Sequence, residues 1–75
     1  MSLQNMRMQR GMTQQELAEK SGVVVGVIRH YEIGYRDIDG AKIKSLAKLA
    51  MVLGCHISDL VNDDETKRDL IKMGM

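Results

Sequence analysis

The chain has 75 residues, a formal net charge of +1, two tyrosines, no Phe or Trp, and a single cysteine. This length allows one domain and excludes a substrate-sized cleft, so we expect no enzyme activity and no cofactor. Because the chain has no long apolar run, no apolar N-terminus and no cysteine pair, the sequence predicts a cytoplasmic protein without a membrane span or signal peptide.

Basic and acidic residues are distributed unevenly along the chain. Residues 1–58 contain eight Lys or Arg and five Asp or Glu, whereas residues 59–75 contain three and five. A mildly basic first part predicts weak non-specific binding to nucleic acid that falls steeply with salt concentration.

Two short helices are predicted first. One covers residues 3–10 and stops before a glycine, and the next covers residues 14–21. Thr13 and Glu16 have the spacing of a capping box, in which each side chain accepts a hydrogen bond from the backbone N–H of the other residue. Gly22 then supplies the left-handed residue that ends the second helix.

A third helix is predicted over residues 25–33 and is ended by Gly34. The tight turn that separates it from the second helix has the spacing of a helix-turn-helix. After a loop, a fourth helix is the clearest by periodicity, because its apolar residues recur at i, i+3, i+4, i+7 and i+10. These residues are Ile43, Leu46, Ala47, Ala50 and Leu53.

A short fifth helix is predicted around residues 58–61, before a charged tail with room for one or two further helical turns. Because the chain has no Phe or Trp and only two tyrosines, the core is expected to be built from Leu, Ile, Val, Ala and Met. The predicted core residues are Leu17, Ile28, Leu46, Leu49, Leu53, Ile57 and Leu60.

Taken together, these residues resemble the DNA-binding domain of the phage-repressor/Cro (XRE) family. The resemblance is carried by Arg7, Gly11, Thr13-Gln14-Gln15-Glu16-Leu17-Ala18, Gly22-Val23, Ile28, Tyr31-Glu32, Gly34, Leu46-Ala47, Leu49-Ala50 and Leu53-Gly54. It implies an all-α, compact five-helix repressor-like domain over residues 1–62, with the helix-turn-helix at helices 2 and 3. The remaining tail, residues 63–75, would be a short helix or a dimerisation segment.

The resemblance also implies which residues contact double-stranded DNA. The third helix would enter the major groove with its early residues toward the base edges. Gln14 matches a phosphate-contacting position at a helix N-terminus, where free N–H groups favour an anion. Arg36 and Lys42 match positions that hold phosphates beside the groove, and an ordinary solvated side chain is the alternative for all three. The candidate readers are Val24, Val25, Gly26, Val27, Arg29 and His30.

The first of these readers depart from the family's pattern. The family usually has Ser, Thr, Gln, Arg or Asn there, whereas this chain has Val24-Val25-Gly26-Val27. Valine can only contact thymine methyl groups. Two explanations remain open. In the first, this apolar face selects T-rich half-sites, and Arg29, His30 and DNA shape supply the rest of the specificity. In the second, the face binds a protein partner.

Charged residues around the third helix have both functional and structural interpretations. Arg29 is the best candidate for a DNA contact, through guanine or a phosphate, with Glu32 or Asp37 as alternative partners. His30 would contact DNA when protonated, or be incidental. The resemblance implies that Arg7 and Glu32 form a structural ion pair between the first and third helices.

We expect no metal site, because Cys55 and His56 are adjacent in the chain and their side chains diverge. Asp37 and Asp39 lie in a loop without a histidine partner or a glycine-rich phosphate-binding segment, so we assign them to the shape of the loop and not to catalysis.

The sequence therefore predicts a small transcriptional regulator that binds double-stranded DNA sequence-specifically. The alternative is a protein-interaction adaptor, antitoxin-like or anti-repressor-like, whose third helix lacks the polar side chains that contact bases. Because one helix reads few base pairs, we expect a homodimer whose recognition helices lie about 34 Å apart, and no small-molecule effector domain. The predicted dimer patch consists of Leu60, Val61, Leu70, Ile71 and Met73.

Overall fold

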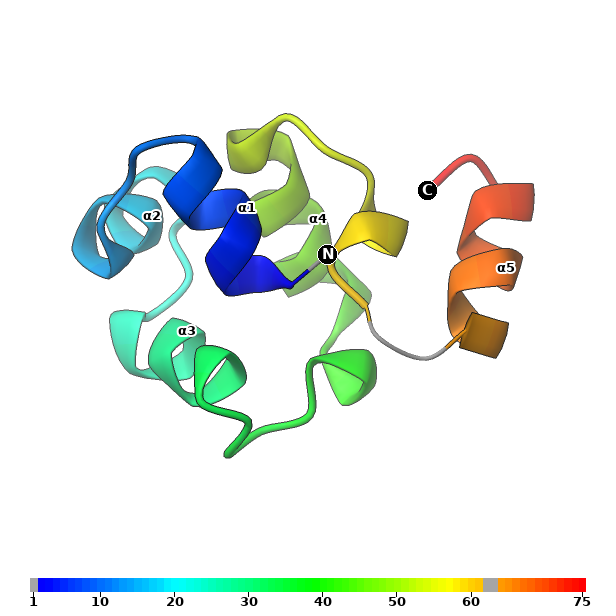
Figure 1. The fold of residues 1–75 in the computed structure, drawn as a ribbon, viewed down its shortest axis with the longest axis horizontal. Helices are drawn as coiled ribbons and strands as arrows, with labels where there is room; N and C mark the ends of the chain where they lie inside the picture. The colour runs from blue at the N-terminus through cyan, green and yellow to red at the C-terminus, as the bar shows by residue number, and fades with distance from the viewer. Residues whose placement is uncertain (1, 62–63) are drawn as a thin grey trace.

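The computed structural model describes residues 2–61 and 64–75, and every regular element within them is helical (Figure 1). The predicted all-α class is therefore confirmed. The elements are α1 (Leu3–Gln9), α2 (Gln14–Ser21), α3 (Val25–Glu32), the 3₁₀ turn η1 (Ile38–Gly40), α4 (Ile43–Leu53), the 3₁₀ turn η2 (Ile57–Asp59) and α5 (Asp64–Lys72).

The ends of the helices follow the local sequence signals. At the start of α2, the Thr13 hydroxyl accepts a hydrogen bond from the Glu16 N–H at 3.0 Å, and the Glu16 carboxylate accepts one from the Thr13 N–H at 3.2 Å. Gly22 ends α2 with a φ of 75°, and Gly54 ends α4 with a φ of 64°. The predicted bounds of α2 are confirmed, and α1 and α3 each end one residue earlier than predicted.

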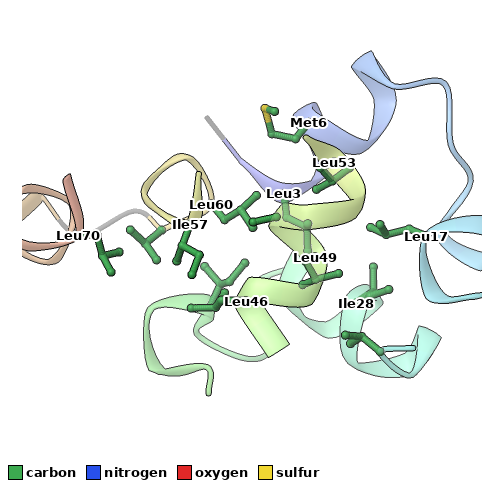
Figure 2. Close-up of a cluster of buried hydrophobic side chains, with 14 residues drawn as sticks. Leu3, Met6, Leu17, Ile28, Leu46, Leu49, Leu53, Ile57, Leu60 and Leu70 are labelled. Carbon is green, nitrogen blue, oxygen red and sulfur yellow. The ribbon is translucent and has the colours of Figure 1, made fainter. Parts of the chain in front are cut away.

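Helix α4 lies at the centre of the aliphatic core, where it packs against α2 and η2 (Figure 2). All seven predicted core residues are buried. The predicted stripe along α4 is partly wrong, because Ile43 is 54% exposed and Ala47 is exposed. The buried face of α4 consists of Leu46, Leu49, Ala50 and Leu53.

The segment after α4 differs most from the prediction. The predicted helix around residues 58–61 is the 3₁₀ turn η2, and the fifth α-helix is formed by the tail as α5. Helix α5 packs against η2 at the end of the molecule away from α2 (Figure 1). Leu70 brings it onto the core beside Ile57 (Figure 2). The expected domain boundary, between residues 62 and 63, lies outside the described residues.

The predicted dimer patch is wrong for three of its five residues. Leu60, Val61 and Leu70 are buried in the core of their own chain and offer no surface to a second copy. Ile71 and Met73 are exposed on α5 and directly after it. Within the part of the chain that the structure describes, no helix is long and apolar enough to cross a membrane.

Candidate nucleic-acid interface

The turn between α2 and α3 is held by a short local network. The buried hydroxyl of Ser21 accepts a hydrogen bond from the Val23 N–H at 3.1 Å, across the left-handed residue Gly22. Val23 is buried, and Ile28 and Leu17 are fully buried on the facing sides of α3 and α2. The turn and this apolar contact fix the angle at which α3 leaves α2.

A buried ion pair fixes α3 from its other end. The Arg7 guanidinium donates to the two carboxylate oxygens of Glu32 at 2.7 and 3.0 Å, and to the Met12 carbonyl at 2.7 Å. The side chains are 12% exposed for Arg7 and 2% for Glu32. The hydrogen bond to Glu32 raises the pKa of Arg7 above its ordinary value, although burial acts in the opposite direction. The structure thus brings together the two residues expected to pair.

Gln14 belongs to the same network. Its side-chain amide donates to the Glu32 carboxylate at 3.1 Å, so three hydrogen bonds converge on that one group. The amide nitrogen has two N–H donors, and one of them makes this bond. The link between Gln14 and Glu32 was not predicted from the sequence, because the two residues are 18 positions apart.

The first turn of α3 exposes apolar groups. Val24 occupies the N-cap, is 68% exposed and makes no side-chain capping bond. A Ser, Thr, Asp or Asn at an N-cap stabilises a helix by ~1 kcal/mol relative to an apolar residue. Val25 and Gly26 are partly exposed, whereas Val27 packs against the core. The Val27 side chain is therefore less accessible to DNA than the side chains of Val24 and Val25.

Gly26 is unusual among the seven glycines of the chain. Five of them have a left-handed φ, which disfavours other residues, but Gly26 has a helical conformation. A Cβ built at Gly26 would meet nothing within 4 Å. Since glycine destabilises a helix by ~1 kcal/mol relative to alanine, neither the backbone nor the packing of the free protein explains this residue.

The predicted basic contacts lie on the surface. Arg29, Arg36 and Lys42 are exposed, and within the described residues Arg29 forms no ion pair with Glu32 or Asp37. The Arg36 N–H donates to the His30 carbonyl at 3.1 Å, which ties the start of the following loop to α3.

His30 is held against Tyr35. The two ring centroids are 4.8 Å apart with an angle of 51° between the ring planes. The Nδ1 atom of His30 is buried and has no hydrogen-bond partner among the described residues. The ring is thus only partly available to DNA, and the contact with Tyr35 was not predicted from the sequence.

Arg10 is a positioning residue that sequence reasoning missed. Its Nε donates to the Leu53 carbonyl at 2.7 Å, so it fastens the end of α1 to the end of α4. The partners are 43 positions apart, and no local pattern signals such a bond. A basic residue beside the last carbonyls of a helix is also favoured by the helix dipole.

Cys55 follows the end of α4 and is half-buried. Burial, and to a smaller extent the Asp59 carboxylate, raise the pKa of the Cys55 thiol above its ordinary value. Among the described residues, no three His, Cys, Asp or Glu side chains come together in a group that could hold a metal ion.

Comparison with known proteins gives one family match. A family model described as "Helix-turn-helix" matches residues 3–60, which include α1 to α4 and η2. No match was found among curated proteins or among solved structures.

Proposed function

Because this chain belongs to the phage-repressor/Cro (XRE) type of the helix-turn-helix family, we propose that it is a sequence-specific transcriptional regulator that places α3 in the major groove of double-stranded DNA. The family as a whole consists of DNA-binding regulators. Phosphate contacts by Gln14, Arg36 and Lys42 would set the position of the helix on the duplex.

The main support for this proposal is that both ends of α3 are fixed to the rest of the fold. One end is fixed by the turn at Gly22 and the other by the buried pair of Arg7 and Glu32, yet the first turn stays exposed. Helix α3 and the loop after it form one side of the molecule (Figure 1). A helix held rigidly at both ends, with its N-terminal turn free, has the geometry of a recognition helix.

We further propose that the protein acts as a homodimer on a two-fold symmetric site. One recognition helix contacts too few base pairs to define a site, and two half-sites one helical turn apart, about 34 Å, would double the information. Ile71 and Met73 are the members of the predicted dimer patch that remain exposed. A chain that stays monomeric in equilibrium ultracentrifugation with its selected duplex would contradict the homodimer.

The first test is selection from a pool of random DNA duplexes at low and moderate salt, followed by sequencing of the retained molecules. A palindromic motif that persists at moderate salt supports a dimeric regulator. Retention at low salt only, without a motif, indicates non-specific binding by basic side chains, and would favour the protein-interaction adaptor.

The second test compares two arginine variants on the selected duplex. Arg29→Ala should weaken binding by about fivefold or more, because a charged hydrogen bond to a base or phosphate contributes ~1–3 kcal/mol. Arg68→Ala is the matched control, since Arg68 is exposed on α5 at the other end of the molecule (Figure 1). Equal losses in the two variants would show that only overall charge matters.

A further inference from the structure

Two residues at the start of α3, one at its N-cap and one in its first turn, lower the stability of the free protein, and no contact within the protein compensates for them. Val24 occupies an N-cap without capping it, and Gly26 occupies a helical position where an added Cβ would meet no neighbour within 4 Å. Local rules of helix stability are most often broken where function requires it. The property that Gly26 does offer is a backbone without a side chain, which another molecule can approach closely.

The chemistry around this bare backbone is apolar. Residues 23–28 contain no side-chain hydrogen-bond donor or acceptor. Val24 and Val25 line a shallow, open hollow between α2 and the start of α3. Among the groups that base pairs display in the major groove, the C5-methyl of thymine is the apolar one.

Resting on the function proposed above, we infer that the first turn of α3 recognises pyrimidine C5-methyl groups by van der Waals contact with Val24 and Val25. Gly26 gives the clearance that brings the helix close enough for this contact. Recognition of the base by hydrogen bonds would then fall to residues farther along α3, with Arg29 the exposed one.

Two features favour base methyl groups over other occupants. The Glu19 carboxylate also lines the hollow, where it accepts a hydrogen bond from Gln15 at 3.2 Å, and a carboxylate disfavours a phosphate at the same place. Because Val27 turns into the core, the exposed apolar surface of this turn is limited to two valines. A surface this small matches one or two methyl groups better than a protein partner.

The experiment uses the duplex selected by the wild-type chain and replaces its thymines by uracil, one at a time. Uracil keeps every hydrogen-bonding group of thymine and lacks only the C5-methyl. We expect about a fourfold loss of affinity for each contacted methyl, the factor that corresponds to burying one methyl-sized group. Replacing a contacted thymine by 5-methylcytosine should weaken binding less than replacing it by cytosine.

The matched variant is Val24→Ser, which removes the apolar side chain and adds an N-cap hydrogen bond, so that folding is not compromised. A double-mutant cycle compares the effect of replacing thymine by uracil on the affinity of the wild-type chain and of this variant. At one position of each half-site, the fourfold loss of affinity seen with the wild-type chain should disappear in the variant. Gln15→Ala, in which a polar side chain at the same hollow is shortened, should keep the wild-type loss.

Equal affinity of the wild-type chain for thymine and uracil duplexes would overturn the inference and leave the proposed function intact. The same holds if the thymine-to-uracil loss is unchanged in Val24→Ser and in Val25→Ala. Failure of the wild-type chain to select any duplex motif would instead remove the proposed function, and this inference with it.

Discussion

Glu32 accepts hydrogen bonds from two side chains that come from two other parts of the fold. Arg7 reaches it from α1 and Gln14 from the start of α2, while Glu32 itself is the last residue of α3. A buried carboxylate with several donors holds these three helices in one arrangement, and removal of the charge leaves its partner unpaired.

Glu32→Gln should therefore lower the free energy of unfolding by ~3–5 kcal/mol, because it strands the buried Arg7 guanidinium. Urea denaturation followed by circular dichroism measures this loss. Glu19→Gln is the control, since Glu19 is exposed and its replacement should change stability by less than ~0.5 kcal/mol. Similar losses in the two variants would show that the ion pair contributes little.

Gly26→Ala should stabilise the free protein by ~1 kcal/mol, because alanine favours the helix and the added Cβ meets no neighbour. The same change should weaken binding to the selected duplex, since the methyl group fills the clearance at the backbone. Thermal unfolding and a DNA-binding titration on one sample give both values.

Gly40→Ala is the control for this pair of measurements. Gly40 also lacks a left-handed φ and also has open space around it, but it lies in η1 and not in α3. We expect Gly40→Ala to keep the wild-type affinity for DNA. A Gly26→Ala variant that is more stable and binds DNA as well as the wild-type chain would show that DNA does not approach the backbone closely at Gly26.

At the scale of single residues, the sequence predicted which side chains lie around α3. It did not predict most of the hydrogen bonds that these side chains form. The expected pairing of Arg7 with Glu32 came from the family resemblance. The bonds of Gln14 to Glu32 and of Arg10 to the Leu53 carbonyl join residues far apart in the chain. Such bonds depend on how the helices pack, so no local spacing could indicate them.

Helices α2 and α3 begin in opposite ways. Helix α2 has a complete capping box, and α3 begins at a valine that caps nothing. Thr13→Ala should lower the free energy of unfolding by ~1 kcal/mol, the usual contribution of an N-cap hydroxyl. Gln4→Ala, on the exposed surface of α1, is the control and should have no measurable effect. The prediction fails if both variants unfold at the wild-type urea concentration.

At the scale of elements, local signals predicted most helix ends correctly. Caps and left-handed glycines act within a few residues, so Thr13 and Gly22 were sufficient to predict both ends of α2. The buried face of α4 was harder, because two overlapping stripes share Leu46, Ala50 and Leu53. The sequence placed Leu49 in the core and Ile43 on the apolar stripe, and only the packing of α4 against α2 and η2 decides that Leu49 is buried and Ile43 is exposed.

At the scale of the whole molecule, α5 follows the matched helix-turn-helix region and packs at one end of it. Its backbone packs on η2, where the Ser58 N–H donates to the Met75 carbonyl at 3.0 Å, and Leu70 is its buried apolar residue. The sequence predicted one or two further helical turns in this charged tail, and the structure extends them to the nine-residue helix α5.

Leu70→Ala should therefore lower stability by ~2–3 kcal/mol, as expected for shortening a leucine that is 6% exposed. Arg68→Ala is the matched control, because Arg68 is exposed on the same helix and outside the predicted dimer patch, so its change should stay within ~0.5 kcal/mol. Urea unfolding of the two variants separates them, and equal stability would mean that α5 does not dock as described.

The scarcity of aromatic residues has a practical consequence for experiments. The chain has no Phe or Trp, so after exchange of its N–H groups in D₂O the aromatic region of its proton NMR spectrum contains only the rings of Tyr31, Tyr35, His30 and His56. Three of these four rings lie on α3 or directly after it, and His56 lies beside η2. Changes in the His30 and Tyr35 signals relative to the His56 signals therefore report binding at α3 by a molecule without aromatic protons of its own, whereas Tyr31 packs against the core.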